Sequence, residues 1–447
     1  MSTGQTVPTA PGRLPGIGHA LRLALPSRLG YLQSLRAYGP VVRLYLGTYP
    51  IYLFNSPEAL REMLQVQSRK FVKGRFFENT RPFIGTGILA SEGDFHLRQR
   101  RMMQPAFHRQ RIAQYIAQMN KEFGQFVENW PARGVISVEQ EMRHVTTGVV
   151  SHTLLTGTAA GDMAALVEEA LPVFVFGVAW RTLAPTELLG KLPTRANRRF
   201  DLLCAKLRDT TAALIRERRA AGTDDGDLLS MLLAARDQDT GEPMSDEEIR
   251  DEIITVFTAG VETVATTLSW ACYALAAYPD VARRLAQEID QVLAGRPVER
   301  QDLSELRYTH AVLNETLRAY HPNWLLMRRS TEAVDIAGMS IPAGAEIIYS
   351  VATLHRDPGL FPEPDRFLPD RWLGPEAELL PRGAFLPFGA GNHQCIGESF
   401  AMTEMAVALT VIAAKWRLEP APGRRHREVA AAILHPKSLQ LRVSPRQ

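Results

Sequence analysis

Cysteine is scarce in this 447-residue chain, which has only Cys204, Cys272 and Cys395. Three cysteines are too few for a disulfide framework and too few for an iron–sulfur cluster held by four thiolates. No stretch reaches the roughly 18 consecutive apolar residues of a membrane span, and the N-terminus lacks a charged segment followed by an apolar one. We therefore expect a cytoplasmic protein without a membrane anchor.

The charge balance is nearly even, with 51 Lys and Arg against 48 Asp and Glu and a net charge of +3. An excess this small does not indicate a nucleic-acid-binding surface. Glycine, proline and charge are spread along the chain, and neither an internal repeat nor a low-complexity linker is visible. The sequence therefore predicts one large domain over residues 1–447, and we expect a monomer.

Helical patterns dominate the first half of the chain after a short β region. Residues 1–30 read as an extended lead-in rich in proline and glycine, and residues 41–46 and 51–54 as two strands of a hairpin. The dipeptide Ser56-Pro57 then opens a helix with a cap residue and with proline at the first position. Apolar periodicity from 94 to 235 predicts further helices.

A long apolar helix is predicted in the second half. Ser245 and Glu248 form a capping box, and the apolar pattern continues to Tyr278. A helix of roughly 30 residues is about 45–50 Å long and, being apolar, must cross the core. We expect a mainly α fold with a small β region, completed by helices at 280–294, at 309–320 and from Cys395 to about 415, and by strands within 327–353.

The most informative segment, residues 385–397, reads FLPFGAGNHQCIG and delivers Cys395 to the start of a helix. The free N–H groups at a helix start favour a thiolate over a thiol. Glycines in this segment let the backbone approach a flat cofactor, and Phe388 can keep water from the sulfur. The pattern Phe-x-x-Gly-x-x-x-Cys-x-Gly resembles the signature of the cytochrome P450 family.

The resemblance implies the fold and the cofactor. It implies haem b held between the long central helix and the loop that carries Cys395, with the Cys395 thiolate as the iron ligand. Phe388 and Gly397 would lie beside the cofactor. Cys204 and Cys272 are expected to be buried structural thiols.

A second likeness concerns a structural charge cluster. Glu315-Thr316-Leu317-Arg318 resembles the family's Glu-x-x-Arg helix, and Pro364-Asp365-Arg366-Phe367 supplies Arg366 as the implied third member. An exposed pair at this spacing would contribute only a few tenths of a kcal/mol. The resemblance instead implies a buried cluster of Glu315, Arg318 and Arg366 that holds the haem loop.

A third likeness lies within the long helix, where Ala259-Gly260-Val261-Glu262-Thr263 interrupts an apolar run. Burying such polar groups unpaired would cost roughly 1–3 kcal/mol each, although a solvated face is an alternative. The resemblance implies that Thr263 hydrogen-bonds bound oxygen and that Glu262 helps to relay protons. Val264 stands where many relatives have a second hydroxyl residue.

The resemblance also implies four cofactor-binding cations. His96 and Arg100 share one face of a helix, and with Arg328 and His393 they would bind the haem propionates through charge-assisted contacts. Three other arginines are expected on the surface, where they would attract an acidic electron donor; these are Arg98, Arg101 and Arg382.

Alignment with the family implies an apolar substrate cavity with few charges, suited to a terpenoid or macrolide-like natural product. The residues expected to line it are Phe76, Phe77, Phe83, Ile88, Phe257, Ala259, Val264, Trp324, Leu325, Leu326 and Ile433.

The function implied by the resemblance is a monooxygenase that inserts one atom of O2 into a hydrophobic small molecule. The haem domain takes up the whole chain, so electrons from NAD(P)H are expected to arrive through a separate ferredoxin or flavodoxin and its reductase. Two alternatives are a peroxygenase or isomerase on the same fold and a non-catalytic haem or ligand-binding protein. Glu262 and Thr263 favour oxygen activation over both.

Overall fold

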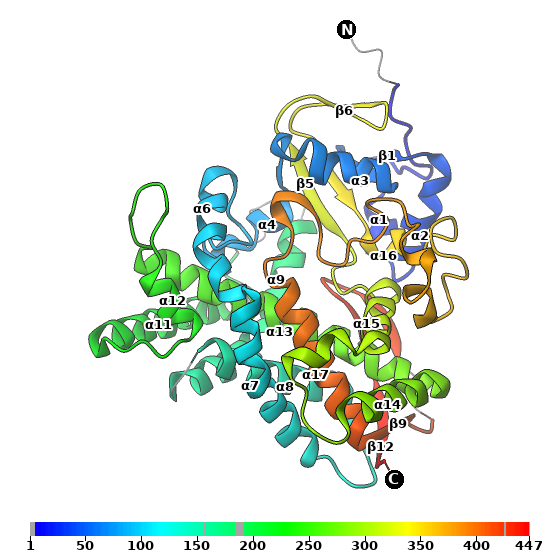
Figure 1. Ribbon diagram of the computed structural model, residues 1–447. Helices are drawn as coiled ribbons and strands as arrows, with labels where there is room; N and C mark the ends of the chain where they lie inside the picture. Colours follow the sequence, from blue (N-terminus) through cyan, green and yellow to red (C-terminus); the bar gives the residue numbers. More distant parts are fainter. Residues whose placement is uncertain (1–4, 156–157, 184–191, 424–425, 447) are drawn as a thin grey trace.

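The computed structural model describes residues 5–155, 158–183, 192–423 and 426–446, and helices are its main element (Figure 1). The long helices are α6 (Gly93–Met103), α7 (Arg109–Glu128), α8 (Val138–Leu154), α9 (Thr158–Leu183), α11 (Arg195–Ala221), α13 (Asp246–Ala277), α14 (Pro279–Leu293), α15 (Arg307–Ala319) and α17 (Glu398–Lys415). The short helices are α1 (Ala20–Ala24), α2 (Arg28–Ser34), α3 (Pro57–Arg61), α4 (Arg75–Glu78), α5 (Arg81–Ile84), α12 (Leu228–Ala234) and α16 (Val351–Leu354). The mainly α fold predicted from the sequence is confirmed.

The largest sheet has the strand order β1-β2-β8-β5-β3, and β2 and β8 form its one parallel pair among the described residues. Its strands are β1 (Val41–Leu46), β2 (Tyr49–Phe54), β3 (Phe71–Lys73), β5 (Leu326–Ser330) and β8 (Glu346–Tyr349). The smaller sheets contain β4 (Gly134–Ser137), β9 (Trp416–Pro420) and β12 (Gln440–Pro445), the pair β6 (Val334–Ile336) and β7 (Met339–Ile341), and the pair β10 (Arg427–Ala430) and β11 (Leu434–Lys437).

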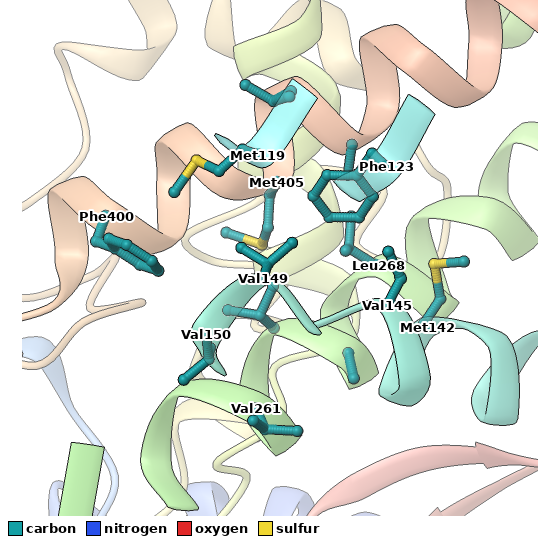
Figure 2. Close-up of a cluster of buried hydrophobic side chains, with 14 of the residues drawn as sticks. Met119, Phe123, Met142, Val145, Val149, Val150, Val261, Leu268, Phe400 and Met405 are labelled. Atoms are coloured by element: carbon teal, nitrogen blue, oxygen red, sulfur yellow. The ribbon is translucent and has the colours of Figure 1, made fainter. Parts of the chain in front are cut away.

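Four helices, α7, α8, α13 and α17, pack together and form the centre of the hydrophobic core. Figure 2 shows their apolar side chains meeting between the helices, with Phe123 from α7, Val149 from α8, Leu268 from α13 and Met405 from α17. Burying each such side chain contributes roughly 1.5–3 kcal/mol. This packing fixes α13 relative to α17, the helix that follows Cys395.

Helix α13 begins as predicted, because the Ser245 hydroxyl accepts the N–H of Glu248 and the Glu248 carboxylate accepts the N–H of Ser245. In the described part of the chain, two helices are long and apolar enough to cross a membrane by length and composition, namely Gly161–Thr182 and Asp246–Ala277. In the second, 72% of the most apolar window is buried inside the protein, which is what a core helix requires.

The N-terminal lead-in is shorter than predicted. Residues 20–24 and 28–34 form α1 and α2 instead of extended chain. Leu32 of α2 is completely buried, and Leu23 and Leu29 of the lead-in pack against the same apolar cluster, which stabilises the two short helices.

Candidate functional site

Cys395 lies between a 3-10 turn, Gly391–His393, and helix α17. The N–H of Cys395 donates to the carbonyl oxygen of Phe388 at 2.8 Å, which closes the loop. Gly391 has a φ of +69°, and a Cβ there would collide with the carbonyl oxygen of Leu64. Only glycine allows this close approach, so the glycine-rich pattern meets a steric requirement of the loop itself.

The Cys395 side chain is exposed, whereas Cys204 and Cys272 are buried. Desolvation nevertheless raises the pKa of Cys395, while a hydrogen bond from Gly397 and the charge of Arg100 act in the opposite direction. A sulfur that has accessible surface and is still desolvated faces a recess inside the fold instead of bulk water. Burial raises the pKa of Cys204 and Cys272 to about 12, so both remain thiols.

Helix α13 has accessible surface at its middle. Ala259 is exposed and Thr263 is half-buried, although residues 251–257 and 264–272 on either side are buried. Ala259 and Thr263 lie one turn apart on the same face, and the Thr263 hydroxyl donates to the carbonyl oxygen of Ala259 at 2.7 Å. Accessible surface in the middle of an otherwise buried helix indicates an internal space.

Glu262 is held by a cation from another helix. Its carboxylate accepts hydrogen bonds from Arg143 of α8, with Nε to Oε2 at 3.2 Å and Nη2 to Oε1 at 3.4 Å. The two side chains are 14% and 31% exposed. The acid beside Thr263 is therefore ion-paired, and water can reach both partners.

Three of the predicted cations gather at the Cys395 loop. The Arg100 guanidinium donates to the carbonyl oxygen of Gln394 at 2.6 Å, and the rings of His96 and His393 lie 4.6 Å apart. Burial lowers the pKa of His96 to about 4, which keeps its ring neutral near pH 7.

Arg328, on β5, is buried and lies between two aromatic rings, 5.9 Å from those of Phe77 and of Tyr349. Its Nη1 donates to the carbonyl oxygen of Met327 at 2.8 Å. Within the described ranges, no carboxylate forms an ion pair with Arg328 or Arg100. A buried guanidinium without an anion is costly, and a propionate would supply that anion.

These features fit a haem. A desolvated thiol faces a recess, α13 has an open face at its middle, and two guanidinium groups have no carboxylate partner among the residues that the structure describes. The four predicted cations come from three elements, Arg328 from the sheet, His96 and Arg100 from α6 and His393 from the Cys395 loop. Burial lowers the pKa of His393, and the nearby charges of Lys73 and Arg328 act in the same direction.

Sequence reasoning missed Lys73 and Glu92, which also belong to this region. The Glu92 carboxylate accepts the main-chain N–H of Lys73 and lies 3.2 Å from Nε2 of His393. The Lys73 ammonium donates to two main-chain carbonyl oxygens of residues 88–91. A single lysine on a short strand usually faces water, so the sequence carried no signal for its burial.

The charge cluster predicted at Glu315 is present. Arg318 donates through Nε and Nη2 to the two Glu315 carboxylate oxygens, each at 2.9 Å, and both side chains are completely buried. Trp372 Nε1 and the N–H of Leu368 also donate to this carboxylate, at 2.9 and 2.8 Å.

The prediction that Arg366 closes the cluster is wrong. Arg366 is exposed and pairs with Glu363, while its carbonyl oxygen accepts a hydrogen bond from Arg318 at 3.2 Å. The third charge is Arg371, whose Nε lies 3.1 Å from a carboxylate oxygen of Glu315. The chain passes the cluster with its backbone at Arg366 and turns through the 3-10 helix Pro369–Trp372, which brings Arg371 inward.

Two buried histidines that the sequence analysis did not identify hold the segment before Cys395. His321 Nε2 lies 2.9 Å from the carbonyl oxygen of Pro387, and His355 Nε2 accepts the N–H of Leu386 at 3.0 Å. Burial lowers the pKa of His355 well below its ordinary value, in keeping with a neutral ring that accepts a hydrogen bond. Each is a single histidine without a partner pattern in the sequence, so only the fold reveals the pairing.

The predicted substrate-facing residues occupy different environments. Ala259 is exposed, and Phe76, Ile88, Leu325, Leu326 and Ile433 are half-buried. Phe257 is wrongly assigned, because its side chain is 0% exposed and belongs to the core. Two residues along a helix correspond to about 200°, so Phe257 and Ala259 point to opposite sides of α13. The remaining members, Phe77, Phe83, Val264 and Trp324, are also buried.

Arg98 and Arg101, both expected on the surface, form ion pairs there, and Arg101 is exposed as expected. Arg98 pairs with Glu248 at 2.7 Å and with Asp237 at 3.3 Å, and Arg101 pairs with Asp239 at 2.7 Å. These acids come from the segment around the start of α13, which is distant in the sequence. Both arginines therefore have acidic partners, and Arg382 is exposed.

Comparisons with known proteins agree over nearly the whole chain. A family model described as Cytochrome P450 matches residues 8–443. The chain is 41% identical over 421 residues to cyclooctat-9-en-7-ol 5-monooxygenase of Streptomyces melanosporofaciens, covering 94% of this chain and 91% of that protein. It is 41% identical to cyclooctatin synthase of the same organism, with coverages of 98% and 95%. It is 37% identical to pentalenene oxygenase of Streptomyces avermitilis, with coverages of 98% and 97%.

Proposed function

The chain belongs to the cytochrome P450 family and is a monooxygenase, and from this premise we propose that its substrate is a terpenoid with an apolar ring skeleton. The observation that carries the proposal is the 41% identity, over 94% of this chain, to a monooxygenase named for cyclooctat-9-en-7-ol. The accessible, uncharged surface at Ala259 also suits an apolar substrate.

We propose that Cys395 ligates the haem iron, with Phe388 and Gly397 around the sulfur, and that Arg100, Arg328, His96 and His393 hold the propionates. When bound, the haem supplies the activation of O2 and the oxidation of the substrate. The protein binds and orients the substrate and controls the protons.

Thr263 and Glu262 would act on protons. Because the Thr263 hydroxyl proton is used on the Ala259 carbonyl, its oxygen can accept a hydrogen bond from a water in the internal space and hold that water in place. The Glu262 carboxylate would exchange between Arg143 and water and so carry protons inward from the protein surface.

We further propose that the protein acts as a cytoplasmic monomer and receives electrons from NAD(P)H through a separate ferredoxin or flavodoxin and its reductase. The experiment is turnover of a terpenoid panel that includes cyclooctat-9-en-7-ol and pentalenene, with NADPH, a ferredoxin, a ferredoxin reductase and ¹⁸O2. One ¹⁸O atom in a terpenoid product is expected. Products formed only with peroxide, unlabelled isomers, or binding without turnover would reject the proposal.

A further inference from the structure

The main chain at Ile88 is held by hydrogen bonds to both its N–H and its carbonyl oxygen. Its N–H donates to Oε2 of Glu252 on α13 at 2.8 Å. Its carbonyl oxygen accepts from Nζ of Lys73 on β3, also at 2.8 Å, and Lys73 donates a second hydrogen bond to the carbonyl oxygen of Ser91 at 2.8 Å. An acid and an amine from distant parts of the sequence therefore hold one loop residue.

The loop around Ile88 also lies directly against α13. A Cβ at Gly85 would collide with the Asp251 carboxylate, and a Cβ at Gly87 would collide with the Thr255 hydroxyl. The loop forms this contact with its own backbone, at glycines that have no side chain. The side chains of α13 that touch the loop backbone therefore set the position of the loop. Glu252 is one of these side chains and is next to Asp251 in the helix.

Lys73 and Glu252 are both buried, at 6% and 0% exposed. Oε1 of Glu252 has no hydrogen-bond partner within the described part of the chain. Burial lowers the pKa of Lys73 to about 7 and raises the pKa of Glu252 to about 8, while each group favours the charged form of the other. Two desolvated ionisable groups are costly to keep in a core, and the contact they share is the Ile88 peptide.

The hydrogen bonds to Ile88 lie on the side of α13 that carries the open face. Glu252 precedes Ala259 by seven residues, which places it two turns away on the same helix face. Ile88 is half-buried and packs against the main core. On the outer side, Gly85 and Thr86 line a surface groove of about 1030 Å³, so the loop lacks core packing there.

We propose that Lys73 and Glu252 are positioning residues that fix Ile88 as a specificity-determining wall of the substrate site. This inference rests on the proposed function, because it takes the space beside Ala259 as that site. A terpenoid skeleton offers few polar groups, so the enzyme must select among its carbon atoms by the shape of rigid apolar walls. A loop wall selects only if its backbone is held.

The test uses the haem-loaded protein and needs no natural substrate. Glu252→Leu removes the acceptor of the Ile88 N–H, and Lys73→Met removes the donor to the Ile88 carbonyl oxygen. Glu252→Gln keeps an acceptor for the Ile88 N–H. Hydrogen–deuterium exchange measures the mobility of residues 85–92, and haem absorbance titrations measure the Kd of 4-phenylimidazole and of imidazole. Imidazole reports coordination alone, and the phenyl ring adds the shape of the surrounding walls.

Glu252→Leu and Lys73→Met are expected to accelerate exchange in residues 85–92 by about tenfold or more. They are also expected to change the ratio of the two Kd values at least several-fold, while Glu252→Gln stays near wild type. Ile88→Ala should change the ratio without faster exchange. Asp227→Asn, in the buried Asp227–Arg218 pair, is the matched control and should leave both readouts unchanged.

Unchanged exchange in residues 85–92 would show that Lys73 and Glu252 do not hold the loop. Faster exchange with an unchanged Kd ratio would overturn the role of Ile88 as a wall. Because both imidazoles bind without being oxidised, either result is independent of whether terpenoids are the substrates, which the labelled-oxygen experiment decides separately.

Discussion

Nε of Arg143 lies 3.2 Å from Oε2 of Glu262, and this contact joins α8 to the middle of α13 beside Thr263. Neither partner is fully buried, at 31% and 14% exposed, so water competes with the ion pair. The Arg143 guanidinium therefore sets the position of the Glu262 carboxylate.

Arg143→Leu should lower the amount of product formed per NADPH consumed by up to about tenfold, because Glu262 loses its fixed position. The Kd of the substrate, measured by the shift in haem spin state, should stay the same, since the substitution leaves the uncharged accessible surface at Ala259 unchanged. Arg143→Lys should restore most of the coupling. Wild-type coupling in Arg143→Leu would show that the ion pair is only structural.

Thr263→Ala should bind substrate normally and release reducing equivalents as peroxide, because the hydroxyl that would hold a water is gone. Peroxide and product are both measured against NADPH. Thr263→Ser keeps the hydroxyl and is the matched control. If Thr263→Ala and the wild type formed the same amount of product per NADPH, substrate hydroxyls or ordered water would take the place of Thr263 in proton delivery.

Cys395→Ser should abolish the strongly red-shifted Soret band that a thiolate ligand gives the reduced CO complex. Cys204→Ala and Cys272→Ala should keep the band, because burial raises the pKa of both thiols to about 12 and neither can readily become a thiolate. A shifted band that persisted in Cys395→Ser would end the ligand assignment.

Three variants separate the members of the charge cluster. Glu315→Ala leaves Arg318 buried and unpaired and should destabilise the protein by roughly 3–5 kcal/mol, with little haem-loaded protein recovered. Arg371→Ala should have a smaller effect in the same direction. Arg366→Ala removes only an exposed pair and should cost about 0–1 kcal/mol. Urea unfolding and haem content measure this order, and a larger loss for Arg366→Ala than for Arg371→Ala would contradict it.

Acid should destabilise the loop before Cys395 through His355. Its pKa in the folded protein lies well below 6.5 because of burial, so below pH 6.5 the unfolded chain binds a proton that the folded chain does not. This histidine should therefore lower the free energy of unfolding by about 1.4 kcal/mol for each pH unit below roughly 6.5. His355→Gln retains a donor and an acceptor without titrating, so its unfolding free energy should fall less steeply in this range. Parallel slopes would show that other groups dominate.

The sequence by itself determined the elements whose signals are local. The capping box at Ser245 and Glu248 fixed the start of α13, since both hydrogen bonds form within one turn. The glycine-rich loop marked Cys395 because its spacing resembles the cytochrome P450 signature, whereas the steric reason for Gly391 is a contact with the distant Leu64. The Glu315–Arg318 pair followed in the same way, because residues three apart on a helix are neighbours.

Tertiary structure decided which distant side chains meet. Arg371 instead of Arg366 reaches Glu315 because a 3-10 turn reverses the chain between them. Phe257 belongs to the core because its face of α13 is covered, a fact set by packing and not by hydrophobicity. The partners of Glu262, Ile88 and His355 lie between 15 and 164 residues away in the chain. Such contacts arise because an unpaired buried polar group is costly, and only the complete fold determines which partner is within reach.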